Sequence, residues 1–267
     1  MLAAHNKIFY GWWNVATGFV GMGLSYAMFT NFGFGTFVLP LNAEFGWSRG
    51  ELSFAYMMAN IAIIIASPFL GMLIDRFGVR RVLIPSVVLM GITVASMNWL
   101  TANIWHFYAL YFLIPFLGAG TLPQSYSRVL IAWFNRRRGI ALGLSLSGFG
   151  LGAFLMPNIA QFIIQGYGWR VAYLAFAVAV FLLPLPMAVF VLREKPEALG
   201  LRPDGEEPSQ DIEDKVQIDQ SQIGLTGEEA ARTSTYWLVL VSFFLVGVGL
   251  TGVVAHLFPL LIDRGID

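Results

Sequence analysis

Seven long apolar runs divide this chain, and they constrain its fold more than any other feature. A stretch of about 20 apolar residues crosses a bilayer as a helix, because every backbone polar group in lipid must be paired within the segment. The runs therefore predict an all-α membrane protein with seven membrane-spanning helices. Their approximate bounds are Gly11–Leu39, Leu52–Ile74, Val82–Leu100, Trp105–Ile131, Ile140–Ile164, Val171–Leu192 and Trp237–Ile262.

Composition excludes a soluble globular protein. The chain is 57% hydrophobic and only 12% charged, with a mean hydropathy of +0.68, whereas soluble domains average roughly 25% charged residues. The first apolar run is too long, and residues 1–10 are too polar, for a removable signal peptide. We therefore expect a retained first helix.

The positions of Lys and Arg predict the orientation, because cytoplasmic loops carry the excess of both. With the N-terminus inside, twelve basic residues fall in cytoplasmic segments and three, Arg49, Arg170 and Arg264, fall outside. We therefore expect a cytoplasmic N-terminus. The twelve are Lys7, Arg76, Arg80, Arg81, Arg136, Arg137, Arg138, Arg193, Lys195, Arg202, Lys215 and Arg232.

An acidic stretch separates six of the runs from the seventh. Eleven of the sixteen acidic residues lie between Glu194 and Glu229, in a segment that also contains Pro196, Pro203 and Pro208. Such a composition buries too little apolar surface to offset the entropy of ordering. It predicts a solvated cytoplasmic linker over residues 193–236.

The charged turn between the second and third runs reads GMLIDRFGVRR. This string resembles the signature loop between helices two and three of the major facilitator superfamily. The matched residues are Gly71, Asp75, Arg76, Gly78, Arg80 and Arg81. Members of that superfamily consist of two six-helix halves joined by a cytoplasmic loop.

The resemblance assigns residues 1–192 to an N-terminal six-helix transmembrane bundle. Residues 193–236 are then the acidic linker, and residues 237–267 are the first helix of a truncated C-terminal bundle. The sequence ends shortly after that helix. We therefore expect an N-terminal fragment of the superfamily fold.

Further strings are similar to the monocarboxylate transporter family and its bacterial oxalate/formate-type relatives. Animal members tend to have an acidic residue beside the Gly-x-Trp of the first helix, whereas Tyr10 stands here. This departure favours a prokaryotic relative in a bacterial inner (plasma) membrane. The matching strings are FYGWWNVATGF, LNAEFGWSRGELS, WFNRRRGIALGLSLSGFGLG, YGWRVAY and RPDG.

The turn has two interpretations. Asp75 is predicted to end the second helix, where the turn arginines can pair with it or with lipid phosphate. The resemblance implies that Asp75 helps to hold the two halves closed on the cytoplasmic side, while Gly71 and Gly78 permit close helix approach and a tight turn. In the alternative, the arginines only set the topology.

Ionisable residues within membrane spans are candidates for function, because burying them is costly. The spans contain Arg128 and His256. Arg128 either reaches the interface as a gate residue or attracts an anionic substrate, and Gln124 and Thr121 share its helix face. His256 either titrates in a proton-coupled cycle or is simply hydrogen-bonded in the bundle.

Four more polar residues, Tyr26, Asn31, Asn158 and Gln161, complete the candidate substrate pathway. Their place in the central cavity is implied by the resemblance, because interhelical hydrogen bonds explain most polar residues at membrane depth. Small residues at spacings of about four also mark the fifth helix as a packing seam, which is either static or sliding. They are Gly139, Gly143, Ser147, Gly148 and Gly152.

The leading functional hypothesis is a secondary transporter of a small organic anion, a monocarboxylate or dicarboxylate of the lactate, formate or oxalate class. Its partners are that anion, a proton or counter-anion, and membrane lipids. The alternatives are a transporter of another solute and a truncated remnant that does not transport.

Enzymatic function is not expected, because the spans lack paired catalytic groups. The chain has no cysteine and no Gly-x-x-x-x-Gly-Lys-Ser/Thr loop, and we expect no metal, cofactor or nucleic acid.

Overall fold

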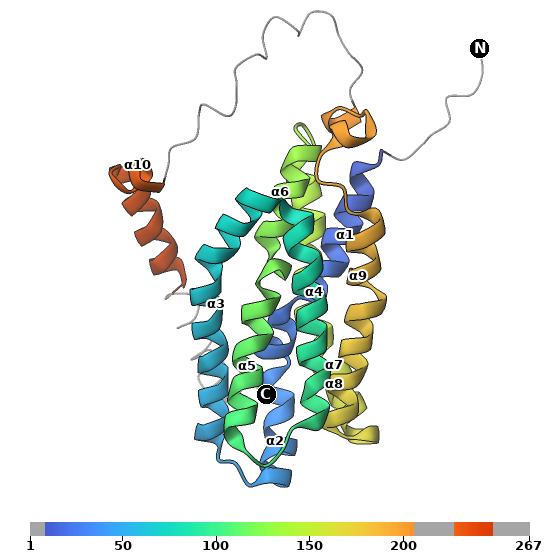
Figure 1. Cartoon of the computed structure of the whole chain (residues 1–267), viewed down its shortest axis with the longest axis vertical. Coiled ribbons are helices and arrows are strands. Elements are labelled where there is room, and N and C mark those ends of the chain that lie inside the picture. The colour runs from blue at the N-terminus through green and yellow to red at the C-terminus, as the bar shows by residue number, and fades with distance from the viewer. Residues whose placement is uncertain (1–8, 206–226, 248–267) are drawn as a thin grey trace, which may run out of the picture. The chain divides into compact units, whose positions relative to one another are not determined.

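The structure, a computed structural model, describes residues 9–205 and 227–247. The chain divides into two compact units, Met1–Glu207 and Pro208–Asp267. Every regular element within the described ranges is a helix, which confirms the predicted all-α membrane fold (Figure 1).

Six segments run up and down through the first unit (Figure 1). The first comprises α1 (Gly11–Gly23), the π-helical turn η1 (Met28–Phe32) and α2 (Phe34–Phe45), and the second is α3 (Arg49–Phe77). The third is α4 (Val79–Ser96) with η2 (Met97–Trp99). The fourth comprises α5 (Ile104–Leu117), η3 (Gly118–Thr121) and α6 (Pro123–Trp133).

The fifth segment is α7 (Arg138–Tyr167), and the sixth comprises α8 (Trp169–Leu182), α9 (Pro184–Pro186) and η4 (Met187–Val191). Two short 3-10 turns, η5 (Pro196–Leu199) and η6 (Pro203–Gly205), follow. In the second unit, α10 (Gly227–Ala231) precedes an apolar helix, Ser234–Gly247. The remainder of the predicted seventh span lies outside the described residues.

Within residues 9–205 and 227–247, five segments are long and apolar enough to cross a membrane: Arg49–Phe77, Val79–Trp99, Ile104–Trp133, Arg138–Tyr167 and Trp169–Val191. The predicted first helix, Gly11–Leu39, is interrupted. Leu24 leaves helical geometry with φ −121° and ψ 29°, and the segment then continues to Phe45. The fourth segment breaks at η3, just before Pro123, whose ring nitrogen has no hydrogen to donate.

Two glycine turns of the same geometry join consecutive helices at opposite ends of the bundle. Gly78, between α3 and α4, has φ 86° and ψ 162°, and Gly168, between α7 and α8, has φ 86° and ψ 164°. A positive φ of this size disfavours any side chain, so glycine allows each helix to reverse direction within one residue. Gly78 thereby confirms the tight turn expected at this position.

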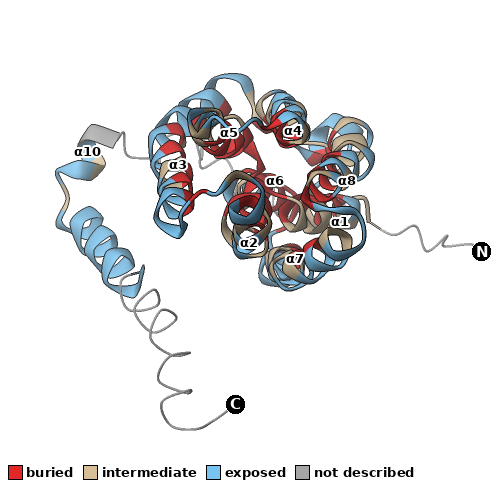
Figure 2. Cartoon of the chain, turned by 90° about the horizontal axis from the view of Figure 1, so that it is seen from below, coloured by how far each residue is buried: buried red, intermediate tan, exposed pale blue. Residues whose placement is uncertain are grey.

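The tightest helix pair in the core is α1 against α7. A Cβ atom at Gly148 would lie 2.1 Å from the carbonyl oxygen of Phe19, and one at Gly152 would lie 2.4 Å from that of Gly23. Two of the five residues of the predicted small-residue ladder, Gly148 and Gly152, therefore pack against α1. Gly139 and Gly143 do not, because no atom lies within 4 Å of a Cβ position at either residue in the described parts of the chain. The buried residues lie on the sides of the helices that face the interior of the bundle (Figure 2).

The bundle extends beyond the predicted boundary at residue 192. We call the end that carries Phe9 and the α3–α4 turn the N-terminal end, and the other the far end. At the N-terminal end, the backbone of Arg193 exchanges two hydrogen bonds with the buried side chain of Asn14, and its carbonyl accepts another from Trp133 Nε1 at 2.7 Å. These contacts anchor the start of the predicted linker to the bundle.

Asp204 holds the next part of that segment. Its Oδ2 accepts backbone hydrogen bonds from Asn135 at 2.8 Å and from Arg136 at 2.7 Å, in the turn between α6 and α7. Acidic residues made this stretch look solvated, but here a carboxylate satisfies two backbone donors of the bundle. Residues 193–205 are therefore part of the first unit.

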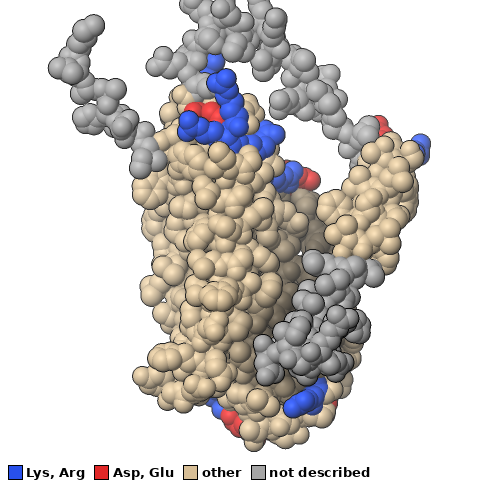
Figure 3. Space-filling view, turned by 180° about the vertical axis from the view of Figure 1, so that it is seen from behind, with Lys and Arg blue, Asp and Glu red and all other residues tan. Residues whose placement is uncertain are grey.

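Charge is confined to the ends of the bundle. On the face shown in Figure 3, Lys, Arg, Asp and Glu lie near the two ends of the bundle, and the side surface between them is uncharged. Large apolar side chains such as Ile64, Phe162 and Phe190 are more than two-thirds exposed on this side surface. A belt of exposed apolar residues is the surface that a membrane-embedded bundle presents to lipid.

The contact between α1 and α7 generates a matched pair of substitutions. We expect Gly148→Ala to lower the free energy of unfolding by about 3 kcal/mol, because the new methyl group overlaps the Phe19 backbone and forces the helices apart. Gly150→Ala, on the exposed side of the same helix, meets no atom within 4 Å and should be neutral or slightly stabilising. Thermal unfolding of the purified protein in detergent measures both, and equal losses would contradict the proposed backbone contact.

Candidate functional site

An ion pair joins Asp75 of the signature loop to Arg128. Arg128 Nη2 lies 2.5 Å from Asp75 Oδ1, and the two side chains are 52% and 64% exposed. Asp75 lies in the last turn of α3, where the negative end of the helix dipole repels its carboxylate. The guanidinium from α6 offsets that repulsion and ties the two helices together. Sequence analysis identified both residues as candidates but predicted that Asp75 pairs with the turn arginines.

The remaining members of the turn have separate contacts. Arg76 lies over the ring of Phe77, with its guanidinium carbon 5.2 Å from the ring centroid. Arg80 donates through Nη2 to the carbonyl of Val189 in η4. Gly71 is exposed, and no described atom lies within 4 Å of its Cβ position, so the expected close approach there is not made by the described residues.

Glu194 explains why a glycine precedes α4. Its Oε1 accepts the backbone N–H of Arg80 at 2.8 Å, and its carboxylate would lie 2.7 Å from a Cβ atom at Gly78. A carboxylate at a helix N-terminus pairs a free N–H and interacts favourably with the helix dipole. Sequence reasoning placed Glu194 in a solvated linker and missed this role, since its partner is distant in the chain.

The predicted polar stripe on the fourth segment divides in two. Gln124 and Arg128 are both exposed on α6. Thr121 is buried, donating to the carbonyl of Gly118 at 2.7 Å and accepting the backbone N–H of Tyr26 at 3.2 Å. Thr121 therefore satisfies the backbone at two helix breaks, while Gln124 and Arg128 form the accessible part of the stripe.

The other pathway candidates lie apart from the ion pair. Tyr26 is buried in the core, and Asn31 accepts a 3.4 Å hydrogen bond from Thr30. Asn158 donates to the Phe154 carbonyl of its own helix at 2.7 Å, and Gln161 is exposed one turn further along α7. His256 lies outside the described residues.

One strip along the exposed surface of α7 carries polar and small residues, beside exposed apolar side chains such as Leu151 and Phe162. The positions of this strip recur every three or four residues, so they share one face. Amide side chains facing lipid would be costly, so this face is suited to water or to another protein surface. The positions are Gly143, Ser147, Gly150, Phe154, Asn158, Gln161 and Gln165.

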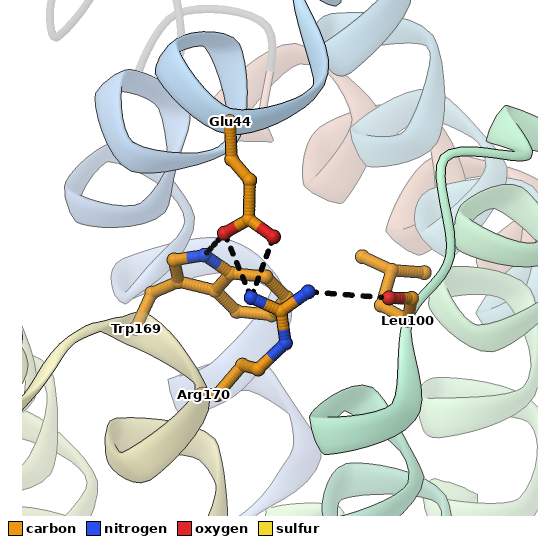
Figure 4. A network of polar contacts seen from close by, with 4 residues as sticks. All are labelled: Glu44, Leu100, Trp169 and Arg170. Carbon is orange, nitrogen blue, oxygen red and sulfur yellow. Dashed lines mark hydrogen bonds and ion pairs between the residues drawn. The ribbon is translucent and has the colours of Figure 1, made fainter.

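A second charged network joins α2 to α8 at the far end of the bundle (Figure 4). Arg170 Nη1 lies 2.6 Å from Glu44 Oε1, and Trp169 Nε1 donates to Glu44 Oε2 at 2.7 Å. The guanidinium also stacks 4.2 Å from the Trp169 ring and donates to the Leu100 carbonyl. Glu44 lies in the family-like string LNAEFGWSRGELS and Arg170 lies in YGWRVAY. The sequence places both strings at the same end of the bundle, and this shared location was the signal that could have indicated their pairing.

The contacts of Glu44 change its acidity. Partial burial raises the pKa of Glu44, but hydrogen bonds from Arg170 and Trp169 and the charge of Arg170 outweigh it, so that the pKa is below the usual 4.5. The carboxylate is therefore stabilised in its charged form.

Across 9–205 and 227–247, no group of three or more His, Asp and Glu side chains is arranged to hold a metal ion.

Comparison with known proteins identifies relatives of the chain. The profile of the Major Facilitator Superfamily matches residues 16–267. Monocarboxylate transporter 14 of Homo sapiens is 30% identical over 135 residues, which cover 49% of this chain and 26% of that protein. Monocarboxylate transporter 9 of Gallus gallus is 28% identical over 162 residues, covering 60% and 31% of the two chains.

A third relative carries a different name. Multidrug resistance protein MdtG of Dickeya zeae (strain Ech586) is 33% identical over 151 residues, which cover 57% of this chain and 35% of that protein. The chain thus spans about a third of the length of the curated relatives that it matches.

The acidity of Glu44 predicts a pH-dependent stabilisation. Because its pKa in the folded state is below the unfolded value, the Glu44–Arg170 pair contributes fully above about pH 4.5 and is lost as pH falls through the folded-state pKa. Both side chains are more than a third exposed, so we expect about 1 kcal/mol at neutral pH.

Thermal unfolding from pH 7 to pH 3 checks this prediction. Glu44→Gln should unfold at lower temperature than wild type at pH 7, and the gap should close toward pH 3. Glu197→Gln, which alters an exposed carboxylate in η5, serves as the control and should follow wild type throughout. A gap that stays constant with pH would contradict the assignment.

Proposed function

Because this chain belongs to the Major Facilitator Superfamily, we propose that it carries a small organic anion across the membrane by secondary active transport with alternating access. The substrate is a monocarboxylate or dicarboxylate of the lactate, formate or oxalate class. Two relatives are named monocarboxylate transporters, which supports this substrate class. The family and its relatives are transporters, and we propose no enzymatic reaction.

The observation that carries the proposal is the exposed Arg128–Asp75 pair. A charged residue on a membrane helix is costly unless it is paired or faces water, and it therefore marks a functional position. Arg128 is both paired and half-exposed, next to exposed Gln124 one turn away on α6. A guanidinium in that setting recognises a carboxylate by charge-assisted hydrogen bonds.

Asp75 and the substrate compete for the same guanidinium. The side chain of Asp75 is itself a carboxylate, so an organic anion that reaches Arg128 offers it the same hydrogen-bonding group. An exposed ion pair contributes only about 1 kcal/mol or less and breaks readily. We therefore assign Asp75 as a latch that holds α3 to α6 until substrate replaces it. The polar face of α7, with Asn158 and Gln161, and the groups of Tyr26 and Asn31 belong to the same pathway.

The remaining assignments follow the topology. The N-terminus and the segment from residue 193 face the cytoplasm of a bacterial cell, residues 237–267 begin the second bundle, and His256 is a candidate proton carrier in symport or antiport. The turn arginines face the same compartment and help to fix this orientation.

The name of one relative favours a second candidate function. MdtG is named a multidrug resistance protein, so export of a different, larger solute by the same bundle is the alternative. A remnant that does not transport is the third possibility.

Uptake by the full-length protein in proteoliposomes separates these possibilities. We expect saturable uptake of one compound from a panel of labelled small carboxylates. Arg128→Gln should reduce kcat/KM at least tenfold, because the substrate loses its charged partner. Asp75→Asn should lower both KM and kcat, since removing the competitor favours binding while the latch is lost.

Arg137→Gln is the matched control, because it removes an exposed arginine from the same end of the bundle without touching the ion pair. Uptake of neutral or cationic solutes only would overturn the anion assignment. Unchanged kinetics of Asp75→Asn would overturn the latch, and absence of all uptake would favour the remnant.

A further inference from the structure

A basic cavity of about 650 Å³ opens at the N-terminal end of the bundle, between the start of α4 and residues 192–198. Its size lies within the range of small-ligand sites. Four basic residues and one acidic residue line it, which leaves a formal charge of three positive units. These residues are Arg80, Arg81, Arg193, Lys195 and Glu194.

The fold holds two of the four basic residues in place and leaves the other two exposed. The guanidinium of Arg80 is held by the Val189 carbonyl, and the backbone of Arg193 is held by Asn14. Glu194 is committed to the N-terminus of α4 through the Arg80 N–H. Arg81 and Lys195 are exposed. The single carboxylate therefore stabilises a helix end, while positive charge remains available to an anion.

An apolar groove of about 400 Å³ adjoins the basic cavity, and Arg81 and Pro85 line both. The groove lies between α3, α4 and α5 and is lined by side chains such as Leu73, Leu89 and Phe116. A charged cavity joined to an apolar groove matches an amphiphile with an anionic head and a hydrocarbon chain. A soluble anion would use the cavity alone.

We propose that these two cavities form a binding site for one anionic phospholipid. Its phosphate lies among Arg81, Arg193 and Lys195, and one acyl chain follows the groove beside Leu89. The site is distinct from the polar face of α7, because α4 and α7 lie on opposite sides of the bundle (Figure 2). Bound lipid would connect the α3–α4 turn to the segment that leaves the sixth helix.

Native mass spectrometry of the delipidated full-length protein tests the headgroup, with phosphatidylglycerol and phosphatidylcholine as probes. Phosphatidylglycerol should bind more tightly, and its advantage should shrink as salt rises. Arg81→Gln and Lys195→Gln should each weaken phosphatidylglycerol binding about fivefold and leave phosphatidylcholine unchanged. Arg137→Gln, from the same end but outside the cavity, should bind as wild type does. Equal binding of the two lipids, or no effect of Arg81→Gln and Lys195→Gln, would overturn the proposal.

A second variant tests the acyl chain. Leu89→Trp places bulk in the groove at an exposed position and should weaken phosphatidylglycerol binding severalfold, with the Arg81 and Lys195 side chains intact. Soluble glycerol phosphate should compete only at far higher concentration than the lipid. Competition at equal concentration, or full lipid binding by Leu89→Trp, would overturn the phospholipid assignment in favour of a soluble anion site. Neither result depends on transport activity.

Discussion

The need to pair every backbone polar group inside lipid governs this structure. Helices meet that need along their length, but each interruption releases donors and acceptors that require other partners. At the break in the first segment, the N–H of Tyr26 finds the hydroxyl of Thr121, which comes from the break in the fourth segment. A side chain at one irregular region thus satisfies a backbone donor at the other. Thr121 is buried for this reason and does not line a pathway.

At the ends of the bundle, carboxylates join segments to one another, two of them by accepting backbone N–H groups. Glu194 caps α4, Asp204 accepts two backbone donors between α6 and α7, and Glu44 joins α2 to α8 through Arg170 and Trp169. Each acid acts between segments that are distant in the chain. The ion pair between Asp75 and Arg128 also joins segments that are distant in the chain, but both of its side chains stay exposed.

Sequence reasoning recovered five long membrane-crossing helices among the described residues and the glycine turn at Gly78, because local hydropathy and turn chemistry determine both. It missed the break after Gly23, since a π-helical turn has no distinct periodicity. It named Asp75 and Arg128 but not their pairing, because periodicity does not reveal which helices are neighbours. Composition misled at residues 193–205, where acidic residues signalled solvent although Glu194 and Asp204 bind the bundle.

The twin turns at Gly78 and Gly168 imply a duplicated architecture. Each reverses the second helix of a three-helix group into the third, with the same backbone angles, but at opposite ends of the bundle. Two similar groups in opposite orientations present nearly the same distribution of apolar residues to either side of the membrane. The apolar core itself therefore favours neither orientation of the bundle. The direction of insertion must then be decided by a handful of loop charges, and a few substitutions outside the membrane could invert the whole molecule.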